Sequence, residues 1–142
     1  VRTQKYIEIR MMDAIPYPLN FSAVALIKGL FYNKDNLNTI YEYVKALSVE
    51  DIDKAKSSII EKGIEGKVKD LNIIEIGLSL IDLAKKGLKI KELKYIEPLE
   101  NMLKEGKNPY LLIKEKAHLG KKEALSWCIL NNILIDMYQS KG

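Results

Sequence analysis

The sequence predicts a mainly α-helical protein, with a bundle of about seven helices preceded by one N-terminal β-strand. From about residue 20 onward, apolar residues recur at the spacing of an amphipathic helix, whereas residues 1–13 alternate with a period of two. Short connections separate the helical stretches, which is typical of helical bundles. With 142 residues, 47% of them hydrophobic and 30% charged, we expect one domain over residues 1–142.

The N-terminal segment, residues 1–13, has the pattern of a β-strand. Ile7 and Ile9 would lie on one face of this strand, and Glu8 and Arg10 would lie side by side on the other. The chain offers no second convincing strand, and unpaired backbone groups need a partner. We therefore expect the strand to pair with a second copy of itself in a homodimer, or to pack as an unpaired extended segment beside the first helix.

The segment that follows the strand is a rigid connector. Pro16 and Pro18 are incompatible with a helix interior and favour an extended backbone. Asp13 and Tyr17 are candidate lining residues of a pocket at the exit of the strand, and the alternative is a turn-forming Asp and a core Tyr.

The helical region, residues 14–142, begins with a helix over about residues 20–32, in which Lys28 is the only charge. A helix that is apolar nearly all round is buried, so we expect it to be central and packed against the apolar face of the strand. Capping residues and glycines bound six further expected helices, over about residues 35–46, 48–63, 72–87, 98–106, 108–120 and 122–138. Residues 63–67 read as a loop and residues 88–96 as irregular, and Gly77 predicts close packing of a neighbouring helix.

Composition excludes several classes of protein. The net charge is +4, but the lysines are scattered and are not interleaved with aromatic residues, so we expect no nucleic-acid binding. No apolar run approaches the ~18–20 residues that span a bilayer, and no signal-peptide core is present, so we expect a cytoplasmic protein without a membrane partner. Cys128 and His118 are the only residues of their kinds, which excludes an internal disulfide and a multi-cysteine metal site.

Residues 6–10, Tyr-Ile-Glu-Ile-Arg, followed by Asp13 and the pair Pro16-Tyr17, resemble a motif of glutamate–cysteine ligases. Four later segments are similar to landmarks of that family in the same order: residues 26–33, 84–88, 97–100 and 106–109. Leu19 and Asn20 stand where the family has an arginine pair, so that contact is not carried over. The resemblance extends over residues 6 to about 116 and concerns the C-terminal part of the family, so we expect the chain to be the C-terminal part of a longer ligase.

The resemblance implies a fold and a reaction. The strand of residues 1–13 would belong to the sheet of a full-length glutamine-synthetase-like ligase. That enzyme joins glutamate to cysteine with ATP through a γ-glutamyl phosphate, the first step of glutathione biosynthesis. Glu8 matches the family's metal-binding glutamate, a ligand of Mg²⁺, and Arg10 matches its catalytic arginine, which contacts the transferred phosphoryl group. Asp13 and Tyr17 are weaker candidates for substrate binding.

The resemblance also implies partners. The substrates would be glutamate, cysteine and ATP, and the N-terminal catalytic half of the same enzyme would supply the other metal and substrate ligands. We therefore expect the chain alone to be inactive, with neither Mg²⁺ nor ATP bound.

Two other classes of function stay open. One is a non-catalytic helical structural or protein-interaction domain, in which Glu8 and Arg10 are an ordinary surface ion pair. The other is a helical DNA-binding module, supported by the basic net charge and the short helices. A recognition helix with Lys or Arg along one face would favour the second class, and the last two expected helices show mixed charges or apolar faces instead.

Overall fold

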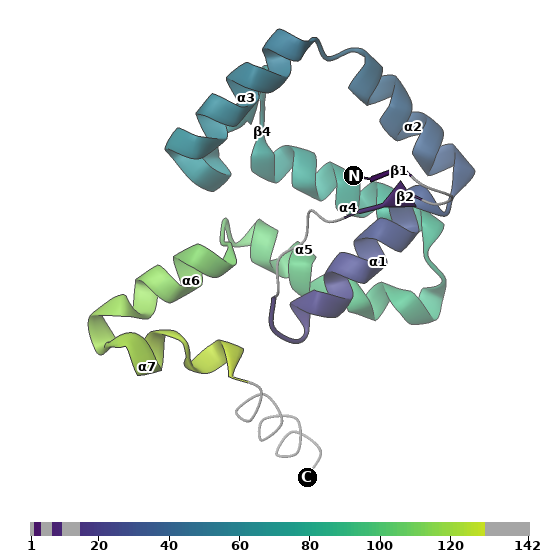
Figure 1. The fold of residues 1–142 in the computed structure, drawn as a ribbon. Helices are drawn as coiled ribbons and strands as arrows, with labels where there is room; N and C mark the ends of the chain where they lie inside the picture. The colour runs from purple at the N-terminus through teal and green to yellow at the C-terminus, as the bar shows by residue number, and fades with distance from the viewer. Residues whose placement is uncertain (1, 4–6, 10–14, 130–142) are drawn as a thin grey trace.

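A computed structural model describes residues 2–3, 7–9 and 15–129, and it confirms a mainly α-helical fold (Figure 1). The α-helices are α1 Leu19–Phe31, α2 Lys34–Lys45, α3 Val49–Lys62, α4 Ile73–Gly87, α5 Glu97–Lys104, α6 Pro109–Lys116 and α7 Lys121–Ala124. The 3₁₀ helices are η1 Gly63–Glu65, η2 Ile90–Tyr95, η3 Ala117–Leu119 and η4 Ser126–Cys128. Among the described residues, no helix is long and apolar enough to cross a membrane.

The N-terminal strand pairs within the chain, contrary to our expectation. β1 (Arg2–Thr3) and β2 (Ile7–Glu8) are antiparallel, with Thr3 opposite Ile7 and Arg2 opposite Glu8. Period-two alternation in the sequence does not distinguish one long strand from a hairpin. Residues that pair across a hairpin lie on the same face of the sheet, so the alternation of polar and apolar residues is the same in both. Pairing β1 with β2 satisfies backbone N–H and C=O groups of both strands, and closing a short loop costs little entropy. It also removes the reason for expecting a homodimer through this strand.

A second hairpin lies where the sequence indicated a loop and a helix start. β3 (Lys67–Val68) pairs antiparallel with β4 (Leu71–Asn72), and Lys69 between them has a positive φ of 53°. These two strands connect η1 to α4.

The predicted helix starts are confirmed where a side chain caps the helix. Ser48 and Asp51 form a reciprocal capping box at α3, and Asn72 and Glu75 form another at α4. The Asn108 side chain accepts a hydrogen bond of 2.8 Å from the backbone N–H of Leu111 at the start of α6. These caps act within four residues of sequence, so the sequence alone identifies them.

The prediction of one helix from residue 122 onward is wrong over its described part. α7 ends at Ala124 and η4 follows, because the Ser126 hydroxyl donates to the Glu123 carbonyl at 2.8 Å and the Cys128 N–H donates to the Leu125 carbonyl at 3.1 Å. Cys128 is half-buried. Residues 130–138 of that predicted helix lie outside the described residues. Residues 90–95, expected to be irregular, form η2.

The first helix is central but is not buried all round. α1 packs mainly on α4, and also on α2, α5 and η2 (Figure 1). Its opposite face stays exposed at Phe21, Val24 and Phe31, with Val24 at 60%. A helix that is apolar nearly all round is usually covered by other parts of a protein. We therefore expect the exposed face of α1 to be a surface on which further polypeptide packs.

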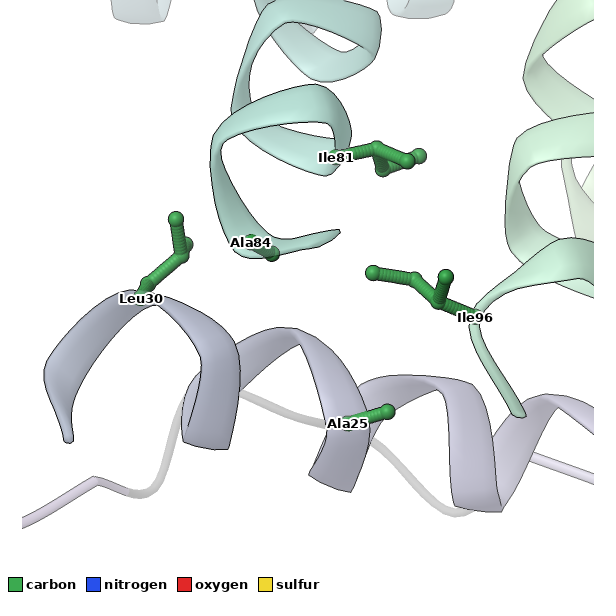
Figure 2. Packing of buried hydrophobic residues seen from close by; sticks show 5 residues of the cluster. All are labelled: Ala25, Leu30, Ile81, Ala84 and Ile96. Atoms are coloured by element: carbon green, nitrogen blue, oxygen red, sulfur yellow. The ribbon is translucent and has the colours of Figure 1, made fainter. Parts of the chain in front are cut away.

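The core lies where α1, α4 and the start of α5 meet. Ala25 and Leu30 of α1 face Ile81 and Ala84 of α4, and Ile96 fills the space between them from the junction of η2 and α5 (Figure 2). Ala84 and Ile96 are fully buried. Two alanines in this cluster let the helix backbones come close.

The closest approach of α1 and α4 is made by glycine. A Cβ atom on Gly29 would overlap the backbone carbonyl of Ala84, and a Cβ atom on Gly87 would overlap the carbonyl oxygen of Gly29. Asn36, which is 3% exposed, closes this contact. Its Nδ2 donates to the carbonyl oxygens of Gly29 and Leu83, both at 2.8 Å. One amide therefore joins α2 to the last turns of α1 and α4.

A charged triad joins α4 to α5. Glu100, which is 9% exposed, accepts from Lys104 Nζ at 2.7 Å and from Lys85 Nζ at 2.6 Å. The hydrogen bonds from Lys104 and then Lys85 lower the pKa of Glu100 below its ordinary value. The hydrogen bond to Glu100 raises the pKa of Lys85.

We expect Gly29→Ala to lower the free energy of unfolding by at least about 2 kcal/mol, because its methyl group overlaps a backbone that has no room to move. Gly77→Ala is the matched control. Its methyl group would meet the Leu103 Cδ1 atom at 2.9 Å, the tip of a flexible side chain, and Ala also gains up to about 1 kcal/mol of helix propensity over Gly. Urea unfolding of both variants checks this, and equal midpoints would contradict it.

Asn36→Ala should cost about 2–3 kcal/mol, since it leaves the carbonyl oxygens of Gly29 and Leu83 without the amide that now satisfies them. Asn38→Ala makes the same change on an exposed residue of the same helix and should cost less than about 1 kcal/mol. Thermal unfolding followed by circular dichroism measures both. A small effect of Asn36→Ala would show that the amide does not hold the three helices together.

Glu100→Gln should destabilise the protein by about 1–2 kcal/mol at pH 7, because an amide replaces a carboxylate that accepts from two lysines. The pKa of Glu100 is lowered in the folded state, so its stabilising effect is fully present above the unfolded pKa of about 4.3 and is lost as the pH falls through the folded pKa.

Unfolding curves of Glu100→Gln and wild type should therefore converge at acid pH. Glu50→Gln on α3 removes a carboxylate whose side chain is 77% exposed, and it should show little effect at any pH. A difference for Glu100→Gln that persists unchanged below pH 4 would contradict the assignment.

Candidate functional site

The structure describes two of the four predicted site residues, Glu8 and Tyr17. Glu8 lies in β2, opposite Arg2 of β1, and Tyr17 lies in the turn that precedes α1. Arg10 and Asp13 lie outside the described residues, so the roles assigned to them remain predictions.

The hairpin brings the backbone of Arg2 opposite that of Glu8, which sequence reasoning did not predict. In one continuous strand Arg2 would lie about 20 Å from Glu8, whereas the observed register places the two residues directly opposite each other. A signal for it was present in the sequence, because Arg2 and Arg10 are the only arginines and every other Lys/Arg position is lysine. Arginine is the better donor to carboxylate and phosphate oxygens.

The described residues do not form a metal site by themselves. Within residues 2–3, 7–9 and 15–129, no group of three or more His, Cys, Asp or Glu side chains is arranged to hold a metal ion. Magnesium is usually bound by one or two carboxylates together with substrate phosphates and water. Glu8 offers one carboxylate, so this part of the chain alone does not fit a complete magnesium site.

Tyr17 belongs to an aromatic cluster, Tyr17–Phe21–Tyr95. The ring of Phe21 lies edge-on to Tyr17 with centroids 6.0 Å apart, and it lies 5.8 Å from Tyr95 at an interplanar angle of 35°. The cluster borders a hollow of about 410 Å³. The hollow is lined by Tyr17, Pro18, Phe21, Lys94, Tyr95 and Pro98.

The core and one ion pair hold the parts of this hollow together. Ile96, fully buried, fixes the end of η2 against α1 and so places the adjacent Tyr95 beside Phe21. Lys28 of α1 pairs with Glu92 of η2 at 2.5 Å. The hydrogen bond from Lys28 lowers the pKa of Glu92, which favours the ionised carboxylate. Tyr17 alone was predicted as a site residue. Phe21 comes from the first predicted helix, and Tyr95 comes from a segment that the sequence indicated to be irregular.

A second hollow lies between α2 and α4. Figure 1 shows α2 and α3 rising from α4 as two sides of a triangle. The space beside α4 holds a cleft of about 470 Å³, lined by Thr39, Ile40, Tyr43, Leu71, Ile76, Ser79, Leu80, Asp82, Leu83 and Lys86. Half of these lining residues are aliphatic, and two of them, Asp82 and Lys86, are charged.

Comparison with known proteins gives one distant match. No protein-family model matches the chain, and no solved structure matches it. The chain is similar to a curated protein, the chloroplastic glutamate–cysteine ligase of Solanum lycopersicum, with 22% identity over 121 residues. The chain resembles part of a glutamate–cysteine ligase. The match takes in 83% of this chain and 23% of the relative, so the chain spans about a quarter of the relative's length.

Proposed function

We propose that the chain is the C-terminal part of an ATP-dependent glutamate–cysteine ligase. The observation that carries this proposal is the similarity to the tomato enzyme over 121 residues, which agrees with the order of the short motifs along the chain. The reaction would produce γ-glutamylcysteine for glutathione biosynthesis, and its substrates would be glutamate, cysteine and ATP.

The chemistry of this reaction defines what the site must supply. The γ-carboxylate of glutamate attacks the terminal phosphorus of ATP, ADP leaves, and an acyl phosphate forms. The amine of cysteine then attacks the acyl carbon, phosphate leaves, and the amine loses a proton. Both steps develop negative charge on phosphate oxygens, so fixed cationic donors at these oxygens lower the barrier.

Residues of the N-terminal segment are suited to this task. We propose that Arg10 contacts the transferred phosphoryl group, since a guanidinium is always charged and donates to two oxygens at once. Glu8 would supply one carboxylate to Mg²⁺, and the remaining ligands would come from the rest of the enzyme. Asp13 and Tyr17 would contact a substrate. Because the remaining ligands would come from the rest of the enzyme, we expect the chain alone to be inactive.

A non-catalytic helical domain that binds the rest of a larger protein is the second candidate. Exposed apolar side chains on α2 and α3 favour it, among them Tyr41 at 64%, Val44 at 51% and Ile60 at 87%. Scattered exposed apolar residues are ordinary, but several on neighbouring helices are typical of protein–protein contacts. In that case Glu8 and Arg10 would have no part in a reaction.

In the full-length protein, Glu8→Gln and Arg10→Lys should each lower turnover with glutamate, cysteine and Mg-ATP at least about 10²-fold, the effect expected for losing one electrostatic contact to a transition state. Glu50→Gln and Lys54→Arg, at an exposed pair on α3, are the matched controls and should leave turnover unchanged.

Turnover like that of wild type in either site variant would remove that residue from the mechanism. A full-length protein that makes no γ-glutamylcysteine would overturn the ligase proposal.

A further inference from the structure

We propose that η2 and the aromatic hollow beside it form a docking surface for an acidic, extended segment of a second protein. Two carboxylates of that segment would pair with Lys91 and Lys94. An aromatic side chain that follows them would enter the hollow against Phe21 and Tyr95. This partner goes beyond the proposed function and does not rest on it, because the substrates of the ligase take no part in the contact.

The first observation is the excess of positive charge around η2. Residues 85–98 contain five lysines and two glutamates. Glu92 is already bonded, since it pairs with Lys28 at 2.5 Å. Lys91 and Lys94 are exposed and make no ion pair with any described residue. A partner that carries carboxylates would supply the opposite charges.

The second observation is the spacing of the two lysines. Lys91 and Lys94 are three residues apart in η2, and residues at this separation in a 3₁₀ helix lie on the same side, about 6 Å apart along the axis. Alternate side chains of an extended segment also share one face, and they are about 6.6–6.8 Å apart. Carboxylates at alternate positions of such a segment would therefore reach both lysines at once.

The third observation is that the rings at the end of η2 stay exposed. Phe21 is 47% exposed and Tyr95 42%, and their ring centres are 5.8 Å apart. Tyr17 packs edge-on against Phe21 and helps to position it. Lys94 also lines the hollow of about 410 Å³, so the charged and the aromatic parts of the surface are continuous. Rings pair favourably with further rings edge-on or offset, so the hollow suits an aromatic side chain.

The surface has the anatomy of a protein–protein contact and is held in place. Interfaces commonly combine an aromatic centre with a polar rim. Ile90 adds an apolar side chain beside Lys91 and is 88% exposed. Ile96 is buried directly after Tyr95, and Glu92 joins η2 to α1 through its ion pair. A surface that is already in its binding conformation loses less entropy when a partner docks.

The acidic segment has to come from outside this chain. The residues that the structure does not describe include two acidic residues, Asp13 and Asp136, and three basic ones, so they do not form an acidic segment. Permanent contacts are more apolar than contacts between proteins that associate reversibly. The lysines of η2 therefore favour a second protein over the rest of a longer polypeptide.

A single-stranded nucleic acid is another anionic partner that lysines and exposed rings bind. Such binding uses a basic groove that follows the backbone over several nucleotides. η2 contributes two lysines on one side, Lys91 and Lys94, which match two carboxylates better than a long row of phosphates. The acidic segment is therefore favoured, and the nucleic acid becomes an outcome of the test.

The test is calorimetric titration of the chain with a short peptide that contains Glu-Ser-Glu-Ser-Trp between glycine–serine ends. Exchange of both glutamates for glutamine, or of the tryptophan for alanine, should weaken binding at least about tenfold. The rearranged peptide Glu-Glu-Ser-Ser-Trp should bind about threefold more weakly, because one glutamate then points away from the lysines. Binding of the first peptide should also weaken as the NaCl concentration rises.

Variants of the chain test the assigned contacts. Phe21→Ala and Tyr95→Ala should each weaken peptide binding about tenfold, whereas Tyr95→Phe should retain it because the ring remains. Lys91→Met and Lys94→Met should each weaken it about twofold to fivefold, the range of an exposed ion pair, and should reduce its salt dependence.

Tyr110→Ala and Lys114→Met are the matched controls. Lys114 on α6 is exposed and lies 5.8 Å from the ring centre of Tyr110, an arrangement like that of Lys94 and Tyr95, so both variants should bind the peptide like wild type. Thermal unfolding of each variant establishes that it is folded. Two results would overturn the inference: peptide binding that is absent or is unchanged by Phe21→Ala and Lys94→Met, and displacement of the peptide by oligothymidylate that binds more tightly.

The full-length protein distinguishes a second protein from the rest of a longer polypeptide. It should bind the peptide as the chain does. Peptide binding by the chain that is lost in the full-length protein would show that the remaining polypeptide covers the surface, and it would overturn the assignment to a second protein. Turnover is a separate result: an active ligase without peptide binding overturns the docking surface alone, and an inactive protein that binds the peptide overturns the ligase alone.

Discussion

The contact that the rest of the structure depends on is the close crossing of α1 and α4 at Gly29. Two backbones meet there without side chains between them, and the amide of Asn36 bonds to a carbonyl of each helix. Such a junction tolerates neither a larger residue nor a missing donor. It fixes the angle between α1 and α4, and it anchors the start of α2 at the same point.

From this crossing the fold determines where functional groups can lie. Packing of α1 on α4 leaves a space that Ile96 fills, and Ile96 brings the end of η2 against α1 (Figure 2). The aromatic hollow therefore depends on the core, because burial of Ile96 between α1 and α4 positions the adjacent Tyr95 beside Phe21. The exposed face of α1 and the exposed apolar residues of α2 and α3 remain available to additional polypeptide. The similarity to a relative more than three times as long is consistent with this.

Sequence reasoning identified features that depend on neighbours in the chain. The capping boxes at Ser48 and Asn72 and the close packing at Gly77 were predictable, because a few adjacent residues or one glycine determine them. The pairing of Arg2 with Glu8, the two hydrogen bonds of Asn36 and the gathering of Tyr95 with Phe21 depend on residues brought together by the fold. No periodic pattern encodes such contacts, which is why the candidate site was less predictable than the helices.

The arm formed by α2 and α3 is fastened to the rest of the molecule at two places. α2 is held to α1 and α4 around Asn36, and α3 packs on η1 and β3, while the cleft lies between α2 and α4. A segment with few buried apolar contacts opens at a lower free energy than the core. Amide hydrogens of α2 and α3 would therefore exchange with solvent through a partial opening of the arm, while those of α1 and α4 would exchange only when the whole domain unfolds.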